Sequence, residues 1–150
     1  MELEILYRDE ELIAISKPAG MLVHRSWLDK AETVFAMQTL RDQIGQHVFP
    51  LHRLDRPTSG VLLFALNSKM AKTMCELFEN HQMEKGYLAV VRGYLQGQAR
   101  VDYPLKVILD KVADKFSQEK ESKEAITDYQ SLAAVEMPYP VGKHQTARYS

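Results

Sequence analysis

A polar segment, residues 50–60, runs directly into the longest apolar run of the chain, Val61–Leu66. Within this segment Asp55 lies between Arg53 and Arg56, and the four residues after Arg56 are proline, threonine, serine and glycine, which favour turns. This order predicts a buried strand preceded by a rigid corner, with the Asp55 carboxylate held on the corner. Two guanidinium groups beside a carboxylate favour its ionised form.

An ionised, partly desolvated carboxylate is the group that a nucleophile or a general base requires. The short string Arg-x-Asp-Arg is by itself more typical of an ion-pair cluster on a surface turn. The longer string is more specific, because residues His52–Gly60, His-Arg-Leu-Asp-Arg-Pro-Thr-Ser-Gly, resemble the signature of the RluA-type pseudouridine synthases. In that family the aspartate is the catalytic residue, and the resemblance implies the same role for Asp55.

Other segments resemble further motifs of the same family. The string Lys-Pro-Ala-Gly at 17–20 resembles its first motif, although the string alone would indicate only a strand that ends at a Pro/Gly turn. The family also has a lysine, a tyrosine two residues later and then a strand that ends at a glycine. The residues in these places are Lys85, Tyr87 and Gly93, and a later strand motif is matched by Ala125, Thr127 and Tyr129.

The reaction that this resemblance implies detaches uracil from its sugar, turns it and rejoins it through carbon. It needs one carboxylate and no cofactor, and Asp55 would either attack the nucleoside or remove a sugar proton. The base must leave the RNA stack, and in the family the arginine that corresponds to Arg53 takes its place there. Alternation puts Arg53 on the same side as Asp55, while Tyr87 would pack on the extruded uracil and take part in the proton step. The residues expected to contact the substrate are Arg53, His52, Arg56 and Thr58.

The implied partner is structured RNA. A tRNA uridine, of the uridine-65 type, is the first expectation, and ribosomal RNA is the alternative. The same residues would also serve a module that binds RNA without catalysis. A hydrolase with a carboxylate pair is disfavoured, because a retaining glycosidase needs two carboxylates about 5 Å apart and the residues beside Asp55 supply no obvious second one.

Length and charge agree with one domain over residues 1–150, since 45% of the residues are apolar and a chain of this length can bury a core. The net charge is -1, but residues 51–100 carry 7 basic and 4 acidic side chains, a local excess compatible with a phosphate-binding rim. The start of the chain, Met1–Glu11, is acidic, and six residues is the longest apolar run. We therefore expect no signal peptide and no membrane span, and we expect a cytoplasmic monomer.

Sulfur-containing side chains and histidines are interpreted as structural. Cys75 falls among apolar residues of a predicted helix, where we expect it to pack in the core. Met70, Met74 and Met83 are interpreted as core filling rather than as a metal or cofactor site. The histidines, at positions 24, 47, 52, 81 and 144, show no metal-ligand spacing, so we expect no metal site.

The predicted elements and the resemblance together imply an α+β fold of the pseudouridine synthase type, in which two helices pack against a mixed, mostly antiparallel sheet and Asp55 lies at the floor of a cleft. An opening hairpin is predicted from Leu3–Tyr7 and Leu12–Ser16. One helix is predicted to follow an N-cap at Thr33 and to stop at Gly45. A second is predicted over Ser68–Glu79, with Asn67 or Ser68 as its cap, and further strands are predicted at 85–94, 101–109, 125–135 and from 145 onwards, with a mobile surface loop at 110–124.

One departure from the family concerns residues 142–148. Family members carry a box of the form Gly-Arg-x-His-Gln-x-Arg, whose last arginine pairs with the catalytic aspartate. Gly142–Gln145 resembles its first half, but it lies too close to the strand of Tyr129, and Thr146–Arg148 does not complete it. We therefore expect this chain to be the N-terminal portion of a longer catalytic domain without the arginine partner of Asp55, and to bind RNA weakly and turn over slowly.

Overall fold

The structure is a computed structural model, and it describes residues 2–24, 34–105 and 122–150. By its internal contacts the chain divides into two compact units, Met1–Lys85 and Gly86–Ser150, and each is described separately below. Most of the mobile loop predicted at 110–124 lies outside the described residues. Neither helix in the described part of the chain is long and apolar enough to cross a membrane.

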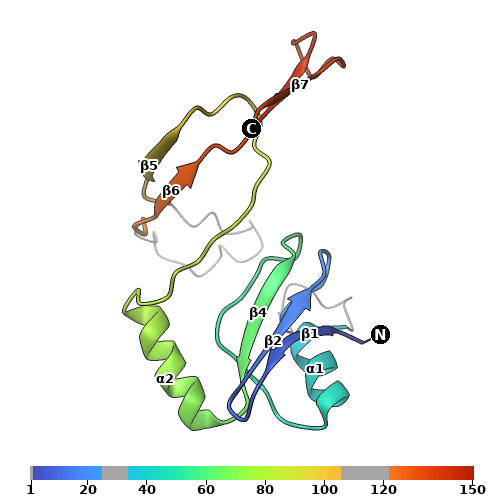
Figure 1. The fold of residues 1–150 in the computed structure, drawn as a ribbon, viewed down its shortest axis with the longest axis vertical. Helices are drawn as coiled ribbons and strands as arrows, with labels where there is room; N and C mark the ends of the chain where they lie inside the picture. Colours follow the sequence, from blue (N-terminus) through green and yellow to red (C-terminus); the bar gives the residue numbers. More distant parts are fainter. Residues whose placement is uncertain (1, 25–33, 106–121) are drawn as a thin grey trace, which may run out of the picture. The chain divides into compact units, whose positions relative to one another are not determined.

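The first unit is built on one antiparallel sheet, shown with its helices in Figure 1. The predicted opening hairpin is confirmed, and its turn is held by Asp9, whose Oδ1 accepts from the N–H groups of Glu11 and Leu12 at 2.8 and 2.6 Å. The short strand before the Asp55 segment was not predicted, because a two-residue element has no measurable periodicity. In the sheet order β1-β2-β4-β3, the strands are β1 (Glu4–Arg8), β2 (Leu12–Lys17), β4 (Gly60–Ala65) and β3 (Phe49–Pro50).

The predicted strand after the Asp55 segment is β4, and both of its faces are covered. Leu62 and Phe64 are fully buried in one core cluster, which also contains Leu40. Leu63 and Ala65 join a second cluster with Met74. Because successive side chains of a strand point to opposite faces, the two clusters lie on opposite faces of the sheet.

Helix α1 (Ala36–Ile44) supplies Leu40 to the first cluster. It begins later than predicted, because Phe35 pairs with Leu22 in an isolated parallel β-bridge and the first amide of the helix donates to the Leu22 carbonyl oxygen at 2.9 Å. The N-cap is therefore Phe35, and Thr33 lies outside the described residues. The predicted stop is confirmed: Gly45 has φ +65°, a left-handed conformation that favours glycine.

Helix α2 (Ser68–Glu79) has the predicted bounds and supplies Met74 to the second cluster. Its predicted cap is also confirmed, because Asn67 Oδ1 accepts from the Met70 N–H at 2.8 Å. The three methionines at 70, 74 and 83 fill this cluster as predicted.

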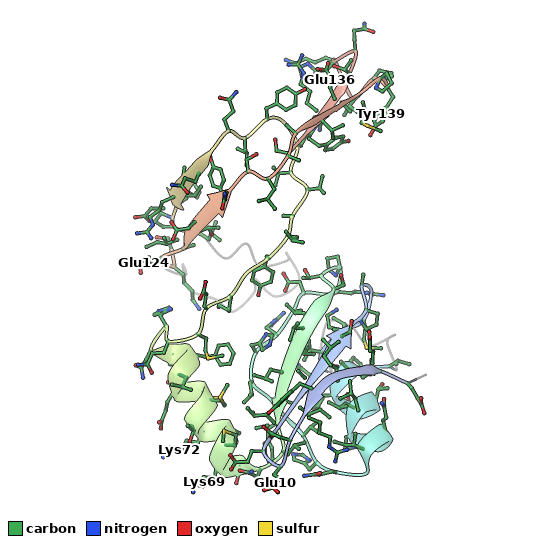
Figure 2. All side chains as sticks on the ribbon, viewed as in Figure 1. Glu10, Lys69, Lys72, Glu124, Glu136 and Tyr139 are labelled. Atoms are coloured by element: carbon green, nitrogen blue, oxygen red, sulfur yellow. The ribbon has the colours of Figure 1, made fainter. Side chains whose placement is uncertain are left out.

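Cys75 does not pack in the core, and that prediction is wrong. The thiol is exposed. Cys75 follows Lys72 by three residues and so shares its face of α2, and Figure 2 shows Lys72 on the outer side of the helix. The apolar neighbours along the sequence misled the prediction, because at helical spacing Met74 and Cys75 lie about 100° apart around the helix axis.

The second unit contains two separate two-stranded antiparallel sheets. The strand predicted over 125–135 is wrong in its length, because pairing stops after Gln130 and resumes at Val135 with another partner. The strand predicted over 101–109 begins earlier, at Gln98, and ends before Pro104, which has no N–H to donate; residues 106–109 lie outside the described residues. The strands are β5 (Gln98–Asp102) with β6 (Ile126–Gln130), and β7 (Val135–Met137) with β8 (Ala147–Tyr149).

The strand predicted over 85–94 is wrong for most of its length. Among the described residues its pairing is limited to the last part, where Arg92 forms an isolated bridge with Tyr149, and Val91 and Ser150 exchange backbone hydrogen bonds of 2.9 and 3.1 Å. Alternation along a sequence indicates an extended backbone, but a strand also requires a partner in the right register.

Candidate active site

The segment that carries Asp55 alternates between buried and exposed side chains. Leu51 and Leu54 are buried with 7% exposure each, whereas the side chains of Arg53 and Asp55 are 73% and 75% exposed. The two leucines therefore fix the segment to the core of the first unit, while the side chains of Arg53 and Asp55 point into the solvent. Arg53 Nη2 lies 3.8 Å from Asp55 Oδ1, so the predicted placement on one side is confirmed.

We expected the Asp55 carboxylate to be partly buried, but the described residues of the first unit do not bury it. The Asp55 side chain is 75% exposed, so the residues of the first unit do not place it at the floor of a cleft. The rigid corner itself is present, because the Thr58 N–H donates to the Asp55 carbonyl oxygen at 3.0 Å and closes a turn. The turn residues fix the backbone of Asp55, but they bring no apolar groups over its carboxylate.

The Lys-Pro-Ala-Gly turn docks directly against the Asp55 segment. The Gly20 N–H donates to the Arg56 carbonyl oxygen at 2.7 Å, and Arg56 Nε donates to the Gly20 carbonyl oxygen at 3.1 Å. Gly20 has φ +87°, a conformation that only glycine adopts without strain. The two segments that resembled family motifs are thus parts of one hydrogen-bonded structure.

Lys17 is a fully buried lysine beneath this contact. Its ammonium donates to the carbonyl oxygens of Met21, Pro18 and Arg56 at 2.7, 3.0 and 3.4 Å. Burial lowers the pKa of Lys17, and the negative charge of Asp55 partly opposes this shift. One side chain therefore holds both the turn at 18–21 and the backbone next to Asp55.

The burial of Lys17 was not predicted from the sequence. It is in phase with Ile13 and Ile15, which are both fully buried on the same face of β2. Its strand position opposite Gly60 places it where the Asp55 segment enters β4. The alternation of β2 could have identified a buried lysine, but only if the register of β2 against β4 had been known.

His52 is half-buried, and its ring contacts other residues of the first unit. Its Nε2 accepts from the Leu63 N–H at 3.1 Å, and its ring lies 5.5 Å from the ring of Phe78 on α2. Burial is the main cause that lowers the pKa of His52, and the positive charge of Lys85 lowers it further, whereas a hydrogen bond with the Arg53 backbone raises it.

The remaining predicted residue, Tyr87, belongs to the second unit and is 63% exposed. The second unit also forms a hollow of about 520 Å³ from residues 92–94, 141 and 144–149. None of the predicted site residues lines this hollow. Among the residues that the structure describes, no group of three or more histidine, cysteine, aspartate or glutamate side chains could hold a metal ion.

A polar cluster around Glu136, labelled in Figure 2, borders this hollow. Thr146 Oγ1 donates to Glu136 Oε1, Tyr94 Oη donates to Oε2 at 3.1 Å, and Arg148 Nε lies 3.5 Å from Oε2. These groups, with the Thr146 hydrogen bond first, lower the pKa of Glu136. Arg148 also lies 5.4 Å from the centre of the Tyr94 ring, so its charge is shared between the ring and the carboxylate.

The docked turn, the aspartate loop and the sheet beneath them identify the class of protein. The chain belongs to the RNA pseudouridylate synthase family, whose model matches residues 11–147. The fold agrees, because the human RNA pseudouridylate synthase domain containing 1 superposes with a TM-score of 0.73 at 21% identity over 99% of this chain and 58% of that one. The predicted α+β pseudouridine synthase fold is thereby confirmed.

Curated relatives narrow the resemblance to one kind of synthase. The chain is 75% identical over 150 residues to tRNA pseudouridine synthase C of Haemophilus ducreyi and 74% identical over 149 residues to that of Haemophilus influenzae. In both comparisons essentially all of this chain is matched, and it spans 62% of the length of the relative.

Proposed function

We propose that this chain supplies the reacting carboxylate of a pseudouridine synthase that isomerises a uridine of tRNA. The observation that carries the proposal is Asp55 itself, which stands exposed beside Arg53 on a backbone fixed by Lys17 and Gly20. Membership of the family and the similarity to two enzymes named tRNA pseudouridine synthase C support this assignment. Ribosomal RNA remains the alternative substrate.

Asp55 acts on the nucleoside, and the other residues hold the RNA around it. The isomerisation breaks the bond between uracil nitrogen and the sugar, turns the base, and forms a bond from a uracil carbon to the same sugar carbon, so nothing is consumed. That uracil carbon loses a proton to the surroundings and the uracil nitrogen released from the sugar takes one up, so the composition is unchanged. Asp55 either attacks the nucleoside or removes a sugar proton, and both routes require its ionised form.

Arg53 and Tyr87 are proposed to handle the base. Arg53 is 73% exposed, and a planar guanidinium can stack in the gap left by an extruded base and contact phosphate. Tyr87 is 63% exposed and would stack on the extruded uracil, an interaction worth roughly 1 to 3 kcal/mol per base. Arg56 and Thr58 are proposed to contact the substrate beside them.

The proposal is tested by Asp55→Asn, with tritium release from tRNA labelled at the uracil carbon that joins the sugar. We expect release to fall at least about a hundredfold, while RNA affinity stays within a few fold. Asp42→Asn is the matched control, because Asp42 is also exposed (67%) and pairs with a neighbouring arginine, Arg41, at 2.8 Å. Unchanged release by Asp55→Asn in a protein of the relatives' full length would overturn the enzymatic role.

A second candidate function is RNA binding without turnover. It is favoured by the 75% exposure of the Asp55 side chain. Under this second candidate we expect the 150-residue chain to bind RNA and to show little or no turnover. Robust tritium release by this chain would contradict that expectation.

We further propose that the protein acts as a monomer in the cytoplasm, on tRNA that has already folded. Sedimentation of the protein in the presence and absence of tRNA measures the first point. A stable dimer without RNA would contradict it.

A further inference from the structure

His52 joins the loop that carries Asp55 to β4 and to α2. Its Nε2 accepts from the Leu63 N–H at 3.1 Å, and its ring packs beside Phe78. The Leu51 N–H donates to the Leu63 carbonyl oxygen at 3.2 Å, so the ring nitrogen accepts where an antiparallel ladder would place a backbone carbonyl. The side chain thus extends the pairing of β3 and β4 by one bond into the loop.

This bond requires one protonation state of the ring. An imidazole nitrogen accepts a hydrogen bond only when it carries no proton, and the imidazolium form can only donate. The half-buried position favours the neutral form, as the lowered pKa of His52 indicates. The groups around the ring are the positive charge of Lys85, the Arg53 backbone, the ring of Phe78 and the Leu63 amide.

We propose that neutral His52 is a positioning residue for Asp55 rather than a residue that contacts RNA. Only two residues separate His52 from Asp55, and one of them is the buried Leu54. On the other side of Asp55, the Arg56 carbonyl oxygen accepts from Lys17 and from Gly20. The loop is therefore anchored on both sides of the carboxylate, and His52 supplies the anchor on the entry side. This inference rests on the proposed function of Asp55.

Three variants separate positioning from other roles. His52→Leu removes the acceptor, whereas His52→Gln replaces it with an amide oxygen that accepts at every pH. His47→Gln is the matched control, because His47 is exposed and lies five residues earlier, with its ring against Phe49 rather than on a backbone amide. The NMR measurements use the 150-residue chain, and the kinetic measurements use a protein of the relatives' full length.

The first experiment makes two NMR measurements at pH 8 and pH 5. Amide hydrogen exchange reports the protection of the Leu63 N–H, and the order parameter of the Asp55 amide reports its mobility. In the unsubstituted chain we expect protection of Leu63 to fall about fivefold once the pH is low enough to protonate the ring, and the lowered pKa of His52 sets this point below the ordinary range of histidine. His52→Leu shows the low protection and a more mobile Asp55 at both pH values, His52→Gln shows neither change, and His47→Gln behaves as the unsubstituted chain. An Asp55 amide that stays equally ordered in His52→Leu overturns the proposal.

The second measurement is the pH dependence of kcat and KM for pseudouridine formation in tRNA. We expect His52→Leu to lower kcat about tenfold with KM within twofold. We expect the unsubstituted protein to lose rate as the ring becomes protonated, and His52→Gln to keep kcat without that loss. A raised KM with unchanged kcat would instead make His52 a substrate contact and overturn positioning. If the unsubstituted chain and Asp55→Asn release tritium equally, the proposed function fails, and the NMR measurement still decides the role of His52.

Discussion

The two units of this chain bury their apolar side chains to very different extents. Among the described residues, 17 buried apolar side chains belong to the first unit and one, Ala147, belongs to the second. The second unit consists of two-stranded sheets, which are marginal in water without a shared core. The comparison teaches that the geometry around Asp55 is set by the first unit, whose core lies on both faces of one sheet.

The difference in burial between the two units is tested most strongly by replacing one leucine with alanine in each unit. Leu62 is fully buried on β4, whereas Leu88 is 89% exposed. We expect Leu62→Ala to lower the free energy of unfolding by about 3 to 5 kcal/mol, and Leu88→Ala to change it by less than about 0.5 kcal/mol. Urea titrations followed by circular dichroism measure both. A loss above about 1 kcal/mol for Leu88→Ala would break the comparison.

The next largest effect is expected at Lys17, where the core of the first unit meets the Asp55 loop. Lys17→Met keeps the length of the side chain but leaves the carbonyl oxygens of Met21, Pro18 and Arg56 without this donor. We expect the free energy of unfolding to fall by about 2 kcal/mol. Lys72→Met on the outer side of α2 is the control and should change it little. Equal stabilities of the two variants would show that the buried ammonium contributes nothing net.

A smaller effect is expected at the start of α2. Asn67→Ala removes the oxygen that accepts from the Met70 N–H, and loss of an N-cap costs about 1 kcal/mol. Asn80→Ala is the control, because Asn80 ends the same helix through its backbone N–H. Thermal unfolding measures the difference. If Asn67→Ala were neutral, the packing of Met74 and its neighbours alone would account for the stability of α2.

The smallest expected effect is a pH dependence confined to the first unit. The pKa of His52 is lower in the folded chain, chiefly because of burial. The unfolded chain therefore takes up this proton first, near pH 6.5, so the stabilisation is complete above that pH and is lost as the pH falls toward the lower folded pKa. Unfolding free energies measured from pH 8 to pH 5 should decline in the unsubstituted chain and decline less in His52→Gln. The same slope in both would assign the titration to another group.

Much of the first unit could be predicted because its signals are local. The Asn67 cap, the bounds of α2 and the stop at Gly45 depend on residues within one or two helical turns. Apart from Cys75, whose exposure follows from its position around the axis of α2, the errors fell where a distant segment decides the outcome. The start of α1 depends on pairing with Leu22, and within the part of the chain that the structure describes the residues after Lys85 pair near Ser150.

The candidate site divides in the same way. Asp55 and Arg53 were placed on one side by alternation, and the structure bears this out at 3.8 Å. The solvation of Asp55 was not foreseen, because turn residues fix a backbone but do not reveal what covers a side chain. The roles of Arg53 and Tyr87 toward RNA stay predictions.

By itself the sequence determined which chemistry is present: an acid beside an arginine, on a turn that leads into a buried strand. The tertiary structure alone decided how that acid is held. Lys17 and His52 reach the Asp55 loop through hydrogen bonds to Arg56 and Leu63. Those contacts depend on the register of β2 and β3 against β4, and register is fixed by packing between segments far apart in the chain rather than by any local preference.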